Sequence, residues 1–200
     1  PDDVIINYWD YYAGPRYPAY DHFDRSKRQM VGLSATWSWR VLYPLFTSNK
    51  ANIEAMATQS ADIGAMGVLV SNWNDRDPSS FAAGYTLTEL SMPHIAYCAA
   101  YTWNLRSLKT DDFMASFGES FYGTNDENYK KAMTLIGEGK AMSFYKEFVM
   151  FYCDPEEVVT SMIAKGDKVY WQDILRYSQE ELGLLETVKA TRNKDYYDST

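Results

Sequence analysis

The fold class of this chain follows from one short apolar run, Met66-Gly67-Val68-Leu69-Val70-Ser71. Nearly every residue in this run is apolar, which is typical of a strand buried inside a parallel sheet. The preceding stretch has helical spacing, and it places on one face Ile53, Met56, Ala57 and Ser60. Gly64 stands between the two segments, where the C-cap of a helix is expected. Helix, glycine and strand in this order indicate a unit of an α/β fold.

Two similar apolar runs come earlier in the chain and extend the same pattern. They are Val4-Ile5-Ile6-Asn7-Tyr8 and Met30-Val31-Gly32-Leu33-Ser34. Between them, a loop that contains glycine and proline leads into a polar stretch, residues 19–29, which predicts a helix. Near-continuous apolar strands separated by helices predict a parallel sheet that is covered on both faces.

After Gly84 the pattern predicts helices alone. They are expected over residues 89–104, from about 111 to 121, over 127–136 with Asn125 as N-cap, over 141–152, after Asp154-Pro155-Glu156-Glu157, and from about Lys168 to Lys194. The change of character falls near residues 105–110. We therefore expect two parts, an α/β part over residues 1–106 and an α-helical extension over residues 107–200.

The number of α/β units bears on the architecture. A (β/α)₈ barrel needs eight units in ~250 residues, whereas this chain holds three units at about that spacing. Three parallel strands cannot close a barrel, and an open sheet of three leaves its apolar edges bare. We therefore expect the C-terminal portion of a (β/α)₈ TIM barrel, its last three βα units, followed by the all-helical extension. Since the sequence begins at Pro1 without an initiator Met, the remaining units are expected upstream.

Composition argues against several classes of function. The 200 residues carry a net charge of −8 with no cluster of Lys or Arg, which argues against electrostatic binding of nucleic acid. No apolar run reaches the ~20 residues of a membrane span. Two cysteines and two histidines are too few for a disulfide scaffold, a zinc site or a histidine-based triad. No cofactor or metal is therefore expected.

Tryptophan is concentrated just after the three predicted strands. Four of the six tryptophans, Trp9, Trp37, Trp39 and Trp73, lie at these places, and Asp10 and Asp75 accompany them. In parallel α/β folds, ligands bind at the carboxyl ends of the strands. Aromatic rings stack on the CH-rich faces of sugars, and carboxylates accept hydrogen bonds from hydroxyls. These six residues are therefore predicted to bind a carbohydrate substrate, the alternative being that the tryptophans plug the end of the sheet.

The order and spacing of these motifs, over about residues 4–105, resemble the C-terminal part of the catalytic barrel of family-20 glycoside hydrolases, the β-N-acetylhexosaminidases. Trp9 resembles the pocket tryptophan of strand six in that family. Ser34-Ala35-Thr36-Trp37 resembles the Ser-x-x-Trp pattern of strand seven, and Trp73-Asn74-Asp75 resembles the Trp-x-acid pattern of strand eight. Pro93 through Trp103-Asn104 resembles the helix that closes the barrel.

The resemblance implies a retaining, substrate-assisted mechanism. In that family the 2-acetamido oxygen of the substrate attacks the anomeric carbon, a Glu acts as acid and then base, and an Asp orients the acetamido N–H. The resemblance places this Asp-Glu pair upstream of Pro1, so this chain is expected to contain substrate-binding walls and no catalytic residue. The expected partners are an N-acetylhexosamine-containing glycan and the remainder of its own barrel.

The chain departs from the family pattern after Trp37. Many members have Tyr-x-Asp there, and the tyrosine hydroxyl holds the acetamido oxygen, whereas this chain has Ser38-Trp39-Arg40. Either another hydroxyl takes that role, or the specificity is altered. The candidate hydroxyls are those of Tyr8, Tyr11, Tyr12 and Tyr43. Arg40 is expected either to bind a charged or sulfated sugar or to pair with Asp10. Asp75 stands where the family usually has Glu.

Three alternatives to this hypothesis stay open. The first is a non-catalytic carbohydrate-binding protein, and the second is a (β/α)₈ glycosidase of different sugar specificity. The third is a structural domain whose aromatic residues form its core. Among the remaining residues, His94 is expected to be structural, His22 to lie on a surface helix, and Cys98 to be a buried free thiol.

Overall fold

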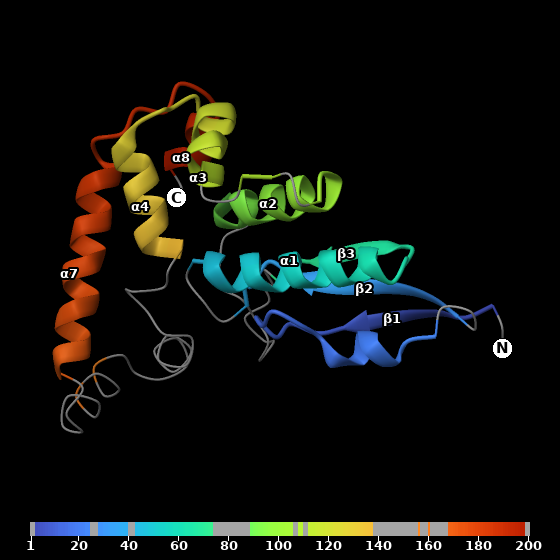
Figure 1. Ribbon diagram of the computed structural model, residues 1–200. Coiled ribbons are helices and arrows are strands. Elements are labelled where there is room, and N and C mark those ends of the chain that lie inside the picture. Colours follow the sequence, from blue (N-terminus) through green and yellow to red (C-terminus); the bar gives the residue numbers. More distant parts are fainter. Residues whose placement is uncertain are drawn as a thin grey trace.

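The computed structural model describes residues 3–24, 28–39, 43–73, 89–105, 108–109, 112–137, 156, 160 and 168–198. Its elements are, in chain order, β1 (Ile5–Trp9), η1 (Pro18–His22), β2 (Gln29–Ala35), α1 (Phe46–Asp62), β3 (Gly67–Ser71), η2 (Glu89–Ser91), α2 (Met92–Trp103), α3 (Phe113–Phe117), η4 (Gly118–Tyr122), α4 (Glu127–Gly137), α7 (Lys168–Leu185) and α8 (Lys194–Asp198). Figure 1 shows the strands on one side of the molecule and α3, α4, α7 and α8 gathered on the other.

The three predicted strands form, and they pair in parallel in the order β1-β2-β3. Ile5 lies opposite Gln29, and Val31 lies opposite Gly67. The sequence therefore predicted these strands and their parallel pairing correctly, because each is a short apolar run bounded by turn signals. This local agreement does not extend to the barrel, which stays a prediction.

Both connections between strands pass over the same face of the sheet. Tyr20 of η1 and Met56 of α1 belong to one buried cluster with Met30 of β2. They meet above Gly32, where a Cβ would lie 2.5 Å from the hydroxyl of Tyr20 and 2.9 Å from the sulfur of Met56. A larger residue at position 32 would therefore force these side chains to shift. Right-handed crossovers between strands in sequential order produce this one-sided arrangement.

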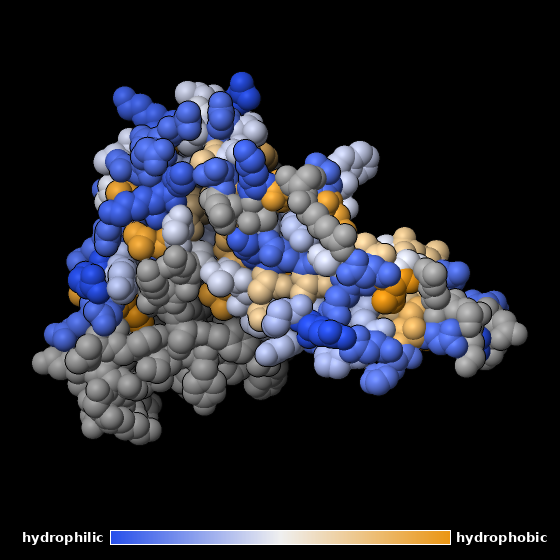
Figure 2. Space-filling model, in the orientation of Figure 1, coloured by the Kyte–Doolittle hydropathy of each residue, from blue (hydrophilic) through white to orange (hydrophobic). Residues whose placement is uncertain are grey.

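The opposite face of the sheet is open. Alternation along the strands places Ile5, Trp9 and Leu69 there, and they are 52%, 63% and 54% exposed. The prediction that both faces are covered is therefore wrong for the described part of the chain. The reason is topological, since sequential strands with crossovers of one hand place their connections on a single side. Figure 2 shows apolar side chains reaching the surface among hydrophilic ones near the strands.

Helix α1 ends as the sequence predicts. Gly64 has a φ of +67°, its N–H donates to the carbonyl of Ala61 at 3.0 Å, and the N–H of Ala65 donates to the carbonyl of Ser60 at 2.8 Å. These two bonds are those of a Schellman motif, which reverses the chain into β3. The predicted inner face of the helix is also confirmed, since its four residues are all buried, namely Ile53, Met56, Ala57 and Ser60.

One apolar core continues across the expected boundary at residues 105–110. It contains Ile53 of α1, Tyr97 of α2, Phe113 of α3 and Tyr129 of α4. Phe113 meets Tyr97 edge-on, with ring centroids 5.0 Å apart. The helical extension therefore packs directly on the helices that cover the sheet (Figure 1).

Three expectations about helices need correction. Where residues 19–29 are described, namely 19–24 and 28–29, they form only the short η1, and the chain is already extended at Gln29 to enter β2. The N-cap of α4 is Asp126, whose Oδ1 accepts the N–H of Asn128 at 2.8 Å, and not Asn125. Helix α7 ends at Leu185 and not near Lys194, since the chain turns there and buries Val188 in the core.

Some expected elements lie outside the described residues, namely 141–152 and the helix start at Asp154-Pro155. No helix within the described ranges is long and apolar enough to cross a membrane.

Candidate functional site

Five aromatic rings meet at the carboxyl ends of the three strands. We call Trp9, Tyr11, Trp37, Trp39 and Trp73 the strand-end cluster. The ring centroid of Tyr11 lies 5.5 Å from that of Trp9, 5.1 Å from that of Trp39 and 6.5 Å from that of Trp73. Trp37 extends the group through Trp39, at 4.8 Å. The cluster thus unites the four tryptophans selected from sequence, and Tyr11 stands at its centre.

Two rings of the cluster are open to solvent. Trp9 is 63% exposed and Trp73 is 42% exposed, while Trp37 and Trp39 are half-buried. Exposed aromatic faces that adjoin one another form a surface on which a ring-shaped ligand can stack.

The hydroxyl of Tyr11 belongs to a hydrogen-bonded group that joins two strands. Nε1 of Trp73 donates to the Tyr11 hydroxyl at 2.7 Å and to Oγ of Ser71 at 3.1 Å. Oγ of Ser71 lies 2.6 Å from the Tyr11 hydroxyl and donates to the carbonyl of Ser34 at 3.1 Å. These contacts hold the Tyr11 ring and the Trp73 indole in fixed positions.

Asp10 faces the loop after β1. Its Oδ2 accepts the hydroxyl of Tyr8 at 3.0 Å, and its Oδ1 accepts the N–H of Tyr12 at 2.8 Å. Burial, and then the bond to Asp10, raise the pKa of Tyr8 to about 12. The Tyr8 ring packs against Tyr17 and Tyr20 on the covered side of the sheet. Asp10 thus shapes the turn that delivers Tyr11, whereas Asp75 and Arg40 lie outside the described residues.

The backbone is left-handed at Trp37, with a φ of +57°. This conformation suits glycine and costs other residues of order 1–2 kcal/mol. The buried Nε1 of Trp37 also has no hydrogen-bond partner in the described part of the chain. Backbone strain of this kind occurs most often at functional positions.

A polar network beneath the cluster joins the ends of β2 and β3. Oδ1 of Asn72 accepts the hydroxyls of Thr36 at 2.6 Å and Ser38 at 2.9 Å. Oγ of Ser38 in turn accepts the N–H of Trp73 at 3.1 Å. Thr36 and Ser38 are fully buried, so this network fixes the two loops that carry Trp37, Trp39 and Trp73.

Helix α1 fixes the ends of β1 and β2 through Asn52. The buried Oδ1 of Asn52 accepts the hydroxyl of Ser34 at 2.6 Å and the N–H of Ala35 at 3.0 Å. Its Nδ2 donates to the carbonyls of Asp10 at 3.0 Å and Tyr12 at 3.3 Å. One amide side chain therefore positions two of the three loops that bear the cluster.

Among the four hydroxyls considered from sequence, only that of Tyr11 lies in the cluster. Tyr8 is bonded to Asp10. Tyr43 is half-buried as a residue, but its hydroxyl is inaccessible and its burial raises the pKa well above the usual value. Tyr12 is 66% exposed and lies against Gly14. Sequence reasoning missed the roles of Ser38, Ser71 and Asn52. The position of Tyr11 could have been recognised from its spacing, because residues two apart in an extended chain share a face, and Tyr11 follows Trp9 by two residues.

The structure confirms the expected burial of Cys98 and the expected exposure of His22, and it places His94 in the core. His94 is fully buried, and burial lowers its pKa to about 3. His22 is exposed on η1. Cys98 is a buried free thiol whose sulfur accepts Nδ2 of Asn49 at 3.1 Å, and burial raises its pKa to about 12.

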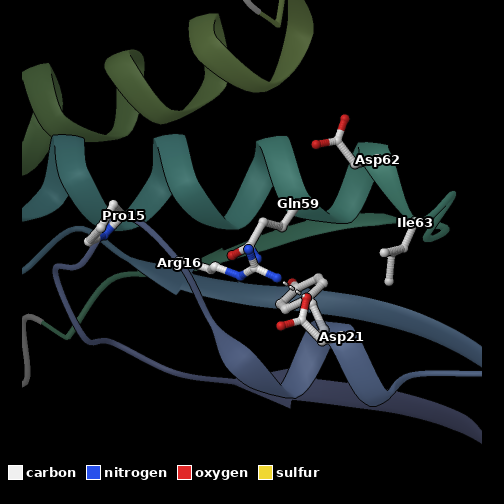
Figure 3. A pocket seen from close by; sticks show the side chains of 7 residues that line it. Pro15, Arg16, Asp21, Gln59, Asp62 and Ile63 are labelled. Carbon is white, nitrogen blue, oxygen red and sulfur yellow. Dashed lines mark hydrogen bonds and ion pairs between the residues drawn. The ribbon is translucent and has the colours of Figure 1, made fainter.

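A separate cavity of about 290 Å³ lies between the last turn of α1 and η1 with its preceding loop. It is lined by Pro15, Arg16, Tyr20, Asp21, Gln59, Asp62 and Ile63. Figure 3 shows Arg16 lying between Gln59 of α1 and Asp21 of η1, whereas the side chain of Asp62 points away from them. Arg16 forms an ion pair with Asp21, and Oε1 of Gln59 accepts the N–H of Tyr17 at 2.7 Å. Arg16, Asp21 and Gln59 thus already have partners within the protein, and the strand-end cluster stays the stronger candidate.

Among the described residues, no three His, Cys, Asp or Glu side chains lie together as metal ligands.

Comparisons of the chain with protein-family models, with curated proteins and with solved structures find no match.

Proposed function

We propose that this chain is the C-terminal portion of the (β/α)₈ barrel of a glycoside hydrolase that removes terminal β-linked N-acetylhexosamine. In this proposal the strand-end cluster forms one wall of the sugar pocket. The observation that carries it is the meeting of five aromatic rings from three consecutive parallel strands at their carboxyl ends. That edge is where barrel enzymes bind their substrates.

The topology of the sheet supports the barrel part of the proposal. Strands in sequential order with both connections on one face are the arrangement of a barrel, whereas doubly wound sheets carry helices on both faces. The outer edges of β1 and β3 have no pairing strand among the described residues. Further barrel units would pair with these edges and cover Ile5 and Leu69 on the open face.

In the proposed mechanism, the residues of this chain bind and orient the sugar. The faces of Trp9 and Trp73 stack on the pyranose ring and exclude water from it. The 2-acetamido oxygen of the substrate attacks the anomeric carbon as the protonated leaving group departs, and a cyclic oxazolinium forms. Water then attacks the same carbon and reopens the ring, so two inversions leave the configuration retained. The acid that protonates the leaving group and the carboxylate that orients the acetamido N–H come from the remainder of the barrel. No cofactor takes part.

The test is an assay of the full natural polypeptide with p-nitrophenyl β-N-acetylglucosaminide and the corresponding glucoside. We expect cleavage of the N-acetyl substrate with retained configuration. Trp9→Ala and Trp73→Ala should each lower kcat/KM about tenfold, equivalent to ~1.4 kcal/mol of lost stacking. The matched control is Trp103→Ala, because Trp103 is 92% exposed at the end of α2 and should leave kcat/KM unchanged.

The outcomes separate the alternatives. Sugar binding without hydrolysis would favour a non-catalytic carbohydrate-binding protein. Preferred cleavage of the glucoside would favour a barrel glycosidase of different specificity. If Trp73→Ala unfolds and the unmodified protein binds no sugar, the remaining alternative is a structural domain whose aromatic residues form its core.

A further inference from the structure

We infer that Oη of Tyr11 is a specificity-determining acceptor, which receives a hydrogen bond from a hydroxyl of the bound sugar. This inference rests on the proposed function for the identity of the ligand as a sugar. It concerns one polar contact in the centre of an otherwise aromatic surface. In such a surface, a single oriented polar group decides which way a ring-shaped ligand lies.

The direction of the hydrogen bonds leaves Tyr11 without a free hydrogen. The Nε1–H of Trp73 can only donate, and it donates to Tyr11 at 2.7 Å. The single hydroxyl hydrogen of Ser71 goes to the carbonyl of Ser34, at 3.1 Å. In the 2.6 Å contact between Tyr11 and Ser71, the hydrogen therefore comes from Tyr11. Tyr11 thus offers an incoming ligand an oxygen and no hydrogen.

The oxygen of Tyr11 can take up a new donor because Trp73 has a second acceptor. Nε1 of Trp73 lies 3.1 Å from Oγ of Ser71 as well as 2.7 Å from Oη of Tyr11. A sugar hydroxyl that donates to Tyr11 can replace one branch of this shared bond, and the indole N–H keeps Ser71 as its partner. No buried donor is left unpaired, so the exchange avoids the usual penalty. Trp73 is 42% exposed and Tyr11 is half-buried, so neither residue is closed off from solvent.

This direction makes a chemical distinction among ligand groups. A hydroxyl or an amide N–H can bind the Tyr11 oxygen, but a carbonyl cannot, because it needs a donor. Tyr11 therefore does not hold the acetamido oxygen in the way that a donating tyrosine would. For Tyr11 to donate to a carbonyl, Ser71 would have to leave the carbonyl of Ser34 and turn its hydrogen to Tyr11.

The experiment measures binding of N-acetylglucosamine and its 3-, 4- and 6-deoxy and deoxyfluoro analogues to the full natural polypeptide by titration calorimetry. A fluorine substituent cannot donate, so it distinguishes a donating hydroxyl from an accepting one. We expect the deoxy and deoxyfluoro analogues at one position to bind about fivefold more weakly. In Tyr11→Phe this difference should vanish, while Tyr12→Phe, a matched change at an exposed tyrosine, should keep it.

Ser71→Ala provides a second, independent variant. It removes the acceptor that takes the Tyr11 hydrogen, so Tyr11 becomes free to donate, and discrimination against the deoxyfluoro analogue should weaken. If Tyr11→Phe instead abolishes the preference for the acetamido group over a hydroxyl, Tyr11 is a donor and the inference is wrong. It is also wrong if the sugar binds and no analogue responds to Tyr11→Phe. If the unmodified protein binds no sugar, the proposed function fails with it.

Discussion

His94 shows how burial alone sets the chemistry of one residue. Its ring packs edge-on against Phe46 and Tyr43, with centroids 5.4 and 5.5 Å away. Neither ring nitrogen has a hydrogen-bond partner in the part of the chain that the structure describes. Because the charged form is not solvated there, the pKa falls to about 3, and His94 stays neutral in the folded protein.

We expect this burial to make the protein sensitive to acid. The unfolded chain protonates His94 near pH 6.5 and the folded chain only near pH 3, so between these values the unfolded state binds more protons. The free energy of unfolding therefore falls as the pH is lowered through this window, by up to about 1.4 kcal/mol per unit. Urea denaturation at pH 7.5, 6, 5 and 4 should show a shallower slope for His94→Gln than for the unmodified protein.

The matched control for this prediction is His22→Gln, since His22 is exposed on η1. Equal slopes for His94→Gln and the unmodified protein would contradict a buried neutral imidazole.

At the scale of elements, α1 both covers the sheet and arranges its carboxyl edge. We expect Asn52→Ala to lower the free energy of unfolding by about 3 kcal/mol, because it leaves buried groups of Ser34, Ala35 and Asp10 without partners. Asn52→Asp should also destabilise, since a carboxylate oxygen would then face the carbonyls of Asp10 and Tyr12. Denaturation followed by tryptophan fluorescence measures both effects.

Asn128→Ala is the control for the Asn52 variants. Its side chain makes an exposed bond to Thr187 at 2.9 Å, so its loss should cost less than about 0.5 kcal/mol. Equal effects at positions 52 and 128 would show that α1 does not hold the strand ends through Asn52.

What the sequence could reveal about these elements depended on how local the signal was. Strands β1 to β3, the inner face of α1 and the turn at Gly64 follow from patterns within a few residues. Asn52 could not be recognised, because an asparagine in a helix is typical of a surface position until its partners in two distant loops are known. Tyr11 and Ser71 are 60 residues apart, and only the register of the sheet brings their hydroxyls together.

At the scale of the whole molecule, the open face of the sheet exposes large apolar side chains to solvent. Exposed apolar side chains beside two strand edges that no described strand pairs favour association with another chain. We expect the 200-residue chain alone to associate as its concentration rises in sedimentation velocity, and Leu69→Lys to reduce this. Leu182→Lys on α7 is the matched control, since Leu69 and Leu182 are 54% and 59% exposed. A monomer at every concentration, or equal effects of the two changes, would contradict this prediction.

The left-handed backbone at Trp37 has a consequence for how this chain can evolve. Selection for stability alone would favour glycine there, because glycine adopts a φ of +57° without a steric penalty. Tryptophan is retained only while its ring contributes something that outweighs this cost. Under the proposed function, the position exchanges stability for sugar binding. A lineage that no longer used the carboxyl edge of the sheet would be free to lose the tryptophan at 37 early.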